Sequence, residues 1–346
     1  MAGVTLFTSL PPSTTRIVNG HDFGPAYQRA CIDSWIAAGF DVVSLNPESE
    51  IAQLRKYDFP ISYLASANPR PQIREFLTEA CRCPTELIGI INADCLLLSY
   101  PAFVQGIVSG ARDGLVMVER VNIDPGSLLP TGQTCLGFDA FFFNKADAAR
   151  VTIDPDLSVG QPWWDYWFPM EFAVSDVKLL RPQSPLIFHL DHEQGWSQAR
   201  WLYYGRKFIT HFSVVDGDRN PSFSAGLREF LDSGSAERED LGGFGDWCFN
   251  WLRDNAEYLK VSQDPTAAEL FGRILAAITN FDGMHAGTLA LAQARRELSE
   301  LAVLKAQLED VRLTRAQQLC RPTQQLRRPK SFLIRLLRVL LKPSQY

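Results

Sequence analysis

The chain reads Leu87-Ile88-Gly89-Ile90-Ile91-Asn92-Ala93-Asp94 near the middle of its first two hundred residues. A continuous apolar run of this length is typical of a central strand that helices cover on both faces. Open α/β sheets bind ligands at the carboxyl ends of such strands, where this run ends on two oxygen-bearing side chains. Because residues i and i+2 of an extended chain point the same way, Asn92 and Asp94 are expected to face one hard cation, Mn²⁺ or Mg²⁺. Alternatively, Asn92 takes a ribose hydroxyl while Asp94 takes the metal, or Asp94 only caps the helix that starts near Pro101.

Short β-rich runs alternate with helical segments on both sides of this strand. Strands are expected at 4–9, 41–45, 61–64, 87–91, 115–119 and 140–143, and helices at 27–37, 47–56 and 71–80. Strands that alternate with helices of about ten residues imply parallel pairing, with helices on both faces. The expected fold class is therefore α/β, a doubly wound, mainly parallel twisted sheet with a helical C-terminal extension.

The pattern changes after residue 211, and four regions are expected. They are a sheet domain at 1–215, a linker and helical region at 216–285, a long helix at 286–326 and a basic amphipathic tail at 327–346. Within 287–318, leucine and valine recur at alternating spacings of three and four residues. This spacing favours either a short coiled coil that joins copies of the chain or a helix that lies back on the sheet domain.

Charge is unevenly distributed along the 346 residues, whose formal net charge is −5. The first 310 residues hold all 39 acidic side chains and 25 of the 34 basic ones, a balance of −14. An acidic body argues against nucleic acid as a partner of the main domain. In the tail, a helix over 331–341 would place Arg335 and Arg338 on one face among apolar side chains. Such a segment suits the surface of an anionic membrane, or a docking site on a partner subunit.

The seven cysteines are odd in number and scattered, which indicates a reducing compartment and no disulfide framework. The N-terminal residues lack the basic and long apolar regions of a signal peptide. No stretch of about 18 uncharged apolar residues is found, so no membrane-spanning segment is expected. The expected location is cytoplasmic; if the tail binds the membrane instead of a partner subunit, the protein is peripheral on the inner face.

The aromatic run 137–143, Gly-Phe-Asp-Ala-Phe-Phe-Phe, has the composition of core, apart from its acid. A carboxylate that opens a strand this apolar must be hydrogen-bonded or paired. Asp139 is therefore expected to bind either backbone amides or a sugar hydroxyl.

The segment 160–167 gathers Trp163, Trp164, Trp167 and a tyrosine around Asp165. Flat aromatic faces stack on the C–H faces of a pyranose, so the segment is a candidate sugar platform. Because a proline precedes it, a helix is expected to start here with Asp165 in its first turn, near the positive end of the helix dipole. The alternative is an amphipathic helix with its aromatic side chains packed inward. At least two of the three tryptophans are expected to be core.

A further strand-like run, 185–192, ends in His189, Asp191 and His192. Carboxylate and imidazole together suit Mn²⁺, so one of these groups could complete a site begun by Asp94. A lone histidine is more often structural, but two of the chain's five histidines fall here.

These segments, in this order, resemble the GT-A-type glycosyltransferases of the nucleotide-diphospho-sugar transferase superfamily. The resemblance covers roughly residues 4–200, and its motifs are the opening strand Val4-Thr5-Leu6-Phe7-Thr8-Ser9, the helix Gln28–Trp35, Asn92-Ala93-Asp94, the strand around Asp139, the segment 160–167 and His189 with His192. Dinucleotide-binding, Walker A, Gly-x-Ser-x-Gly and HExxH motifs are not found, which disfavours the enzyme classes that depend on them.

The resemblance implies roles for individual residues. Asn92-Ala93-Asp94 looks like the family's metal and nucleotide-sugar motif, usually Asp-x-Asp, which leaves Asp94 as the main ligand of Mn²⁺ or Mg²⁺. His189 or His192 resembles the late histidine that contacts metal or diphosphate in such enzymes. Asp165 occupies a position like that of the acceptor-side acid, which in inverting members is the general base that removes the proton of the acceptor hydroxyl.

Thr8 would lie near the nucleotide base and Arg16 near the diphosphate. The expected nucleotide-sugar contacts are Thr8, Arg16, Asn92, Asp94, Asp139 and Trp164. The expected function is transfer of a sugar from a nucleoside-diphosphate donor to a saccharide or surface-polymer acceptor, with the help of a divalent metal.

Two other functions remain open. A phosphoester hydrolase built on Asp94, His189, Asp191 and His192 would need two metals about 3.5–4 Å apart, and hence more ligands than these. A non-catalytic GT-A-like binding or scaffold protein is the other alternative, because the first acid of the usual motif is Asn92.

Overall fold

The computed structural model describes residues 3–18, 21–98, 100–125, 130–154, 156–183, 186–192, 195–214, 220–234 and 241–259. They belong to the first of two compact units, Met1–Arg296. The second unit, Glu297–Tyr346, lies outside the described residues, as do the long helix expected at 286–326, the expected coiled coil and the basic tail.

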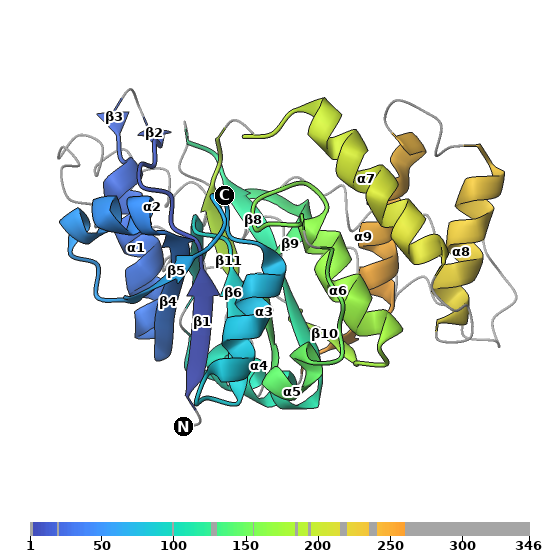
Figure 1. Ribbon diagram of the computed structural model, residues 1–346, viewed down its shortest axis with the longest axis horizontal. Coiled ribbons are helices and arrows are strands. Elements are labelled where there is room, and N and C mark those ends of the chain that lie inside the picture. Colours follow the sequence, from blue (N-terminus) through green and yellow to red (C-terminus); the bar gives the residue numbers. More distant parts are fainter. Residues whose placement is uncertain are drawn as a thin grey trace, which may run out of the picture. The chain divides into compact units, whose positions relative to one another are not determined.

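A ten-stranded sheet forms the centre of the first unit (Figure 1). Its main path runs β12-β10-β8-β9-β6-β1-β4-β5. These strands are β1 (Val4–Thr8), β4 (Phe40–Pro47), β5 (Ser62–Ser66), β6 (Leu87–Ile91), β8 (Leu115–Ile123), β9 (Pro130–Asn144), β10 (Leu179–Arg181) and β12 (Glu257–Tyr258). All neighbouring pairs on this path are parallel except those that β9 makes with β6 and β8. The expected mainly parallel α/β sheet is therefore confirmed.

Two short strands lie off the main path and position the candidate site. β11 (Ile187–Leu190) pairs in parallel with the second half of β8 and antiparallel with β7 (Cys95–Leu97). A separate two-stranded sheet joins β2 (Ile17–Val18) to β3 (His21–Asp22). Strand β8 pairs with β10 through its first residues and with β11 through its last residues. The sheet therefore extends beyond the carboxyl end of β6.

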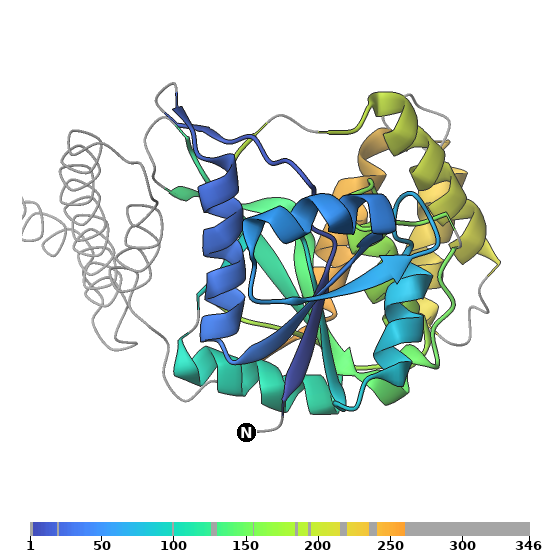
Figure 2. The same ribbon diagram turned by 60° about the vertical axis from the view of Figure 1, so that its left-hand side comes forward.

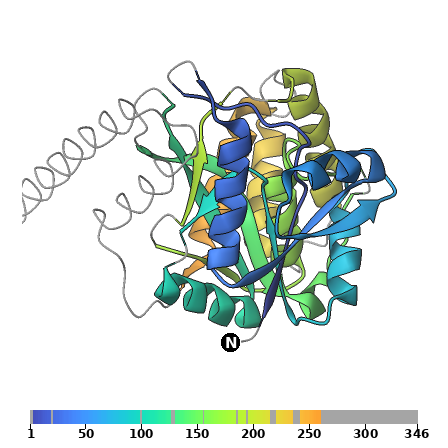
Figure 3. The ribbon, with the colours of Figure 1, turned by 90° about the vertical axis from the view of Figure 1, so that its left-hand side faces the viewer.

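Helices cover both faces of the sheet. They are α1 (Gly24–Ala37), α2 (Glu48–Leu54), α3 (Ile73–Arg82), α4 (Pro101–Asp113), α5 (Lys145–Ala148), α6 (Trp164–Val174), α7 (Gln198–Ser213), α8 (Pro221–Asp232) and α9 (Phe244–Asp254). Helices α1 and α4 pack on one face, and α3 and α6 to α9 contribute to the core on the other (Figures 2 and 3). Side chains alternate between these cores along each strand, so Phe142 faces α1 and α4 while Phe141 and Phe143 face α6.

Strand β9 differs most from the sequence expectation. A strand was expected at 140–143, whereas β9 spans Pro130–Asn144 and runs antiparallel to both of its neighbours. Its first half lacks the apolar alternation that marks a strand, and it is held by pairing with β8 through several register shifts. Non-local pairing of this kind leaves no local signal in the sequence.

Residues after 215 contribute to the same sheet domain. Helices α8 and α9 add apolar side chains to the core beneath α6 and α7, and β12 pairs with β10 at the edge of the sheet. Among the helices that the structure describes, none has the length and apolar character needed to cross a bilayer.

Candidate active site

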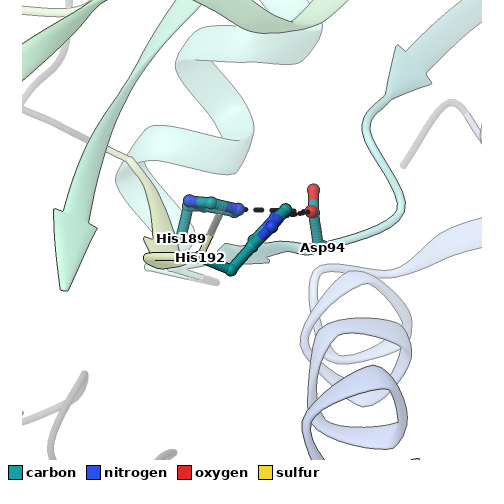
Figure 4. Close-up of side chains that lie close together, drawn as sticks. All are labelled: Asp94, His189 and His192. Atoms are coloured by element: carbon teal, nitrogen blue, oxygen red, sulfur yellow. Dashed lines mark hydrogen bonds and ion pairs between the residues drawn. The ribbon is translucent and has the colours of Figure 1, made fainter. Parts of the chain in front are cut away.

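Three side chains from distant parts of the chain converge at the carboxyl edge of the sheet (Figure 4). Asp94 lies in the turn between β6 and β7, His189 lies in β11, and His192 follows that strand. The Nε2 atoms of His189 and His192 each lie 3.2 Å from Oδ2 of Asp94. The pairing of β7 with β11 brings these side chains together, because Cys95, the residue after Asp94, lies directly opposite His189.

Arg16 contacts the same carboxylate oxygen. Its guanidinium donates to Oδ2 of Asp94 at 2.7 Å and to the carbonyl oxygen of Thr15 at 2.9 Å. Burial alone would raise the pKa of Asp94, but His189, His192 and Arg16 outweigh it and hold that pKa well below its usual value. Asp94 is therefore an anion at neutral pH, ready to bind positive charge.

A hydrogen bond to the side chain of Asn122 orients the ring of His189. Its Nδ1 lies 3.1 Å from Oδ1 of Asn122, and the amide nitrogen of Asn122 donates to Asp191 at 3.0 Å. The amide oxygen of Asn122 faces the ring, so Nδ1 is the donor of this hydrogen bond, and the ring is held with Nε2 directed at Oδ2 of Asp94. Histidines that bind metals are commonly held in this way by a hydrogen bond to the other ring nitrogen.

The donor set fits a transition-metal ion. One donor atom each from Asp94, His189 and His192 can be chosen so that all three lie within 4.8 Å of one another. Imidazole nitrogens suit first-row transition metals and carboxylate oxygens suit Mn²⁺ among them, whereas Mg²⁺ prefers oxygen ligands alone and keeps several waters. The residues present therefore favour Mn²⁺ over Mg²⁺.

Asn92 and Asp139 bind each other. The amide of Asn92 donates to Oδ1 of Asp139, and the backbone N–H of Asn92 donates to the carbonyl oxygen of Asp139 at 2.9 Å. Arg120 also donates to Oδ1 of Asp139, at 3.2 Å. Asp139 is thus paired, as its burial requires. Asn92 and Asp94 take different partners because the chain turns at Ala93 and Asp94 instead of staying extended, so the expectation that both face one cation is not met.

Asp165 lies in the first turn of α6, half-buried against β9. Its carboxylate lies so close to Gly137 that a Cβ there would sit 2.2 Å from Oδ2. Burial, and then the negative charge of Asp139, raise the pKa of Asp165 to about 7, although backbone N–H groups and Arg120 partly oppose the shift. A carboxyl group with this pKa can exchange a proton near neutral pH.

The tryptophans of segment 160–167 are core residues. Trp163 and Trp167 are 0% exposed, and Trp164 is 3% exposed with its ring edge-to-face against Phe141. Trp163 adopts a left-handed backbone conformation and donates its indole N–H to the carbonyl oxygen of Trp201. The alternative interpretation, inward packing, therefore describes all three rings, and Trp164 presents no free ring face to a sugar.

A different tryptophan pair lies closer to the surface. Trp196 and Trp201 are half-buried and stack with ring centroids 5.6 Å apart and planes inclined by 18°. Trp196 follows His192 by only four residues, and Trp201 packs on Trp163 below it. This pair was not predicted from the sequence, although a tryptophan four residues after His-x-x-His was a usable signal.

Thr8 is the last residue of β1 and lies opposite Ser44 of β4. Its hydroxyl is buried and has no hydrogen-bond partner among the residues that the structure describes. On the neighbouring strand, Ser44 bonds to Asn46 at 2.6 Å, and Asn46 donates to Glu50 at 2.8 Å. This polar group at the end of β4 was also missed, because its members lie within an ordinary strand-to-helix connection.

Searches of protein-family models and of curated proteins find no match to the chain. Among solved structures, similarity is found to the mannosyltransferase PcManGT from Pyrobaculum calidifontis, with 13% identity, 87% of each chain covered and a TM-score of 0.44. Residues 1–349 of TarS from S. aureus share 12% identity, over 86% of this chain and 88% of that one, with a TM-score of 0.43. A mannose-1-phosphate geranyltransferase from Thermus thermophilus shares 12% identity over 42% of this chain, with a TM-score of 0.29, and this chain spans 58% of its length. These identities and TM-scores describe a distant likeness in structure.

Proposed function

We propose that the chain is a metal-assisted glycosyltransferase that moves a sugar from a nucleoside-diphosphate donor to a saccharide or surface-polymer acceptor. The observation that carries the proposal is the convergence of Asp94, His189 and His192 at the carboxyl edge of a mainly parallel sheet. Ligands of open α/β sheets bind at this edge.

In this proposal Asp94, His189 and His192 hold Mn²⁺. The bound ion would supply positive charge to the departing diphosphate. Arg16 would add a second positive charge, since its guanidinium already lies 2.7 Å from Asp94 and is held on its other side by Thr15. A guanidinium can bind phosphate oxygens with two parallel hydrogen bonds.

The nucleotide would lie along the ends of β1 and β4. The buried hydroxyl of Thr8 offers a donor and an acceptor there, beside the polar group of Ser44 and Asn46. Asn92 would face the ribose, braced by its bonds to Asp139. Trp164 is not part of the proposed set, because its ring is buried.

On the acceptor side, Asp165 would act as the general base. A base with a pKa of about 7 is ionised in a large fraction of molecules at neutral pH and still binds a proton effectively. The half-buried ring of Trp196, stacked on Trp201, would support the acceptor sugar. A base on the side of the acceptor favours inversion at the transferred carbon.

The test is a thermal-shift screen against nucleotide-sugars with and without Mn²⁺, followed by turnover with the donor that raises the melting temperature. Asp94→Asn keeps the size of the side chain and removes its charge, so we expect loss of Mn²⁺ binding and of nucleoside-diphosphate release. Asp41→Asn is the matched control, because Asp41 is exposed at the opposite, amino end of β4. Full activity of Asp94→Asn with saturating Mn²⁺ would show the metal assignment to be incorrect.

The same experiments separate the alternatives. Binding of no donor at all would favour a scaffold protein. Phosphate-ester hydrolysis without a sugar would favour a hydrolase. That function has less support, since Asp191 bonds to Asn122 and the described residues hold a single cluster of three metal-competent groups.

A further inference from the structure

Helix α1 covers the edge of β7 that pairs with no strand in the described part of the chain. One edge of β7 pairs with β11. On the other edge, the indole N–H of Trp35 donates to the carbonyl oxygen of Cys95 at 2.8 Å, and the hydroxyl of Ser34 accepts the N–H of Leu97 at 3.0 Å. Side chains of α1 thus satisfy backbone groups that a neighbouring strand would otherwise bind.

Tyr27, which lies earlier on the same helix, makes a different kind of contact. Its hydroxyl donates to the carbonyl oxygen of Asp94 at 2.8 Å and accepts the backbone N–H of Leu190 at 2.8 Å. A tyrosine hydroxyl has one proton to donate, and here that proton goes to Asp94. The single oxygen atom therefore joins the turn that carries Asp94 to the strand end between His189 and His192.

We propose that Tyr27 is a positioning residue that keeps Asp94 at the ion-binding separation from His189 and His192. This inference rests on the proposed metal site. The two segments it joins are about one hundred residues apart in sequence, and each carries part of the donor set.

Burial makes the connection rigid and its loss costly. Tyr27 and Leu190 are both 0% exposed, so water cannot easily replace the missing hydroxyl. Without it, the buried N–H of Leu190 and the part-buried carbonyl of Asp94 would lack this partner. The ring itself is packed in the core and lies 5.7 Å from the guanidinium carbon of Arg16.

The test compares Tyr27→Phe with Ser34→Ala in the full-length chain. Both variants remove one hydroxyl of α1 that binds backbone next to the site, but the hydroxyl of Ser34 does not reach β11. Mn²⁺ affinity is measured by titration calorimetry at a temperature at which melting curves show both variants folded. We expect Tyr27→Phe to weaken Mn²⁺ binding roughly tenfold, the scale on which groups supporting a metal ligand act, and Ser34→Ala to change it less than about twofold.

Amide hydrogen exchange without metal gives a second readout. The Leu190 amide should exchange faster in Tyr27→Phe and at the wild-type rate in Ser34→Ala, because Tyr27 is the acceptor for that N–H. Wild-type Mn²⁺ affinity in Tyr27→Phe, or equal weakening in both variants, would overturn the inference and leave the proposed function standing. A wild-type chain that binds no Mn²⁺ would overturn the metal site itself, and the positioning role with it.

Discussion

Gly137 and Asp165 are in van der Waals contact, and the contact depends on the absence of a side chain at position 137. A Cβ at this position would lie 2.2 Å from Oδ2 of Asp165. The backbone of Gly137 also has a φ of +136°, a conformation that glycine adopts far more readily than other residues. Strand β9 therefore accepts the carboxylate of Asp165 directly against its backbone, beside Asp139.

Gly137→Ala should displace Asp165 and lower turnover. The new methyl group cannot coexist with the carboxylate, so the base would leave its position. We expect at least a tenfold fall in kcat, because misplacement of a catalytic group by about 1 Å can cost a hundredfold. The measurement is the rate of nucleoside-diphosphate release. Gly160→Ala is the control, since Gly160 has a φ of +75° but no atom within 4 Å of its Cβ position. An equal loss in both variants would indicate backbone strain alone.

Asp165→Asn should have opposite effects on activity and on stability. The activity of the wild type should fall as the pH drops below about 7, because protonated Asp165 cannot accept a proton. Above pH 7 the Asn variant should lose about 10²- to 10⁴-fold in turnover, the usual contribution of a general base, and its own rate should lack the fall at lower pH. The pH profile of kcat/KM is the measurement, and a wild-type profile that stays flat between pH 5 and 8 would argue against the assignment.

For stability the sign follows from the raised pKa. The folded chain holds the proton of Asp165 up to about pH 7, whereas the unfolded chain releases it near the ordinary value of 3.8. Folding stability from this group is thus greatest below about pH 4 and declines as the pH rises towards 7. The Asp165→Asn variant has no titratable group at this position, so its folding stability should not decline in this way as the pH rises. Above pH 7 we expect it to be more stable than the wild type by on the order of 2 kcal/mol, less than the full shift implies because the group is partly solvated. Urea unfolding at pH 4 and pH 8 measures the difference, with Asp41→Asn as the control.

Much of the parallel half of the fold could be predicted from the sequence. The strand Leu87–Ile91 was predicted to the residue, because a short run of apolar residues bounded by polar ones is typical of a buried strand. Asp94 and His189 were linked for a similar reason, since both follow apolar runs and the carboxyl ends of parallel strands meet at one edge. The fold class was therefore enough to predict that Asp94 and His189 lie at the same edge of the sheet.

The remaining features depend on pairings between distant residues. Nothing near His189 shows that β11 pairs with β7, nor that Tyr27 would reach both segments. The partner of Asn92 was hidden for the same reason, because Asp139 lies 47 residues away on a strand that runs in the opposite direction. Composition alone also could not separate the buried tryptophans of segment 160–167 from the half-buried Trp196.

Trp196→Ala should weaken the use of the acceptor without affecting the donor. The ring stacks on Trp201 at the surface, and loss of a stacking ring should raise the KM for a saccharide acceptor severalfold while donor binding and thermal stability change little. Trp35→Ala is the contrasting variant, because that ring is fully buried and its loss should lower the melting temperature sharply. An unchanged acceptor KM in Trp196→Ala would place the acceptor elsewhere.

Asn92→Asp should destabilise the chain, although it recreates the Asp-x-Asp motif of the family that the sequence resembles. In the wild type, the amide of Asn92 donates to the carboxylate of Asp139. An aspartate at position 92 offers no such donor, so two carboxylates would share a half-buried site. We expect a loss of about 1–3 kcal/mol in the free energy of unfolding at pH 7, measured by urea denaturation.

A double-mutant cycle with Asp139→Asn tests the cause. In the double variant Asn92→Asp/Asp139→Asn, the amide and the carboxylate exchange places, so the hydrogen bond can form again and part of the lost stability should return. Arg120, which donates to Asp139 in the wild type, limits the recovery because its charge then faces an amide. Independent, additive effects of the two substitutions would show that the Asn92–Asp139 bond is not the reason for asparagine at this position.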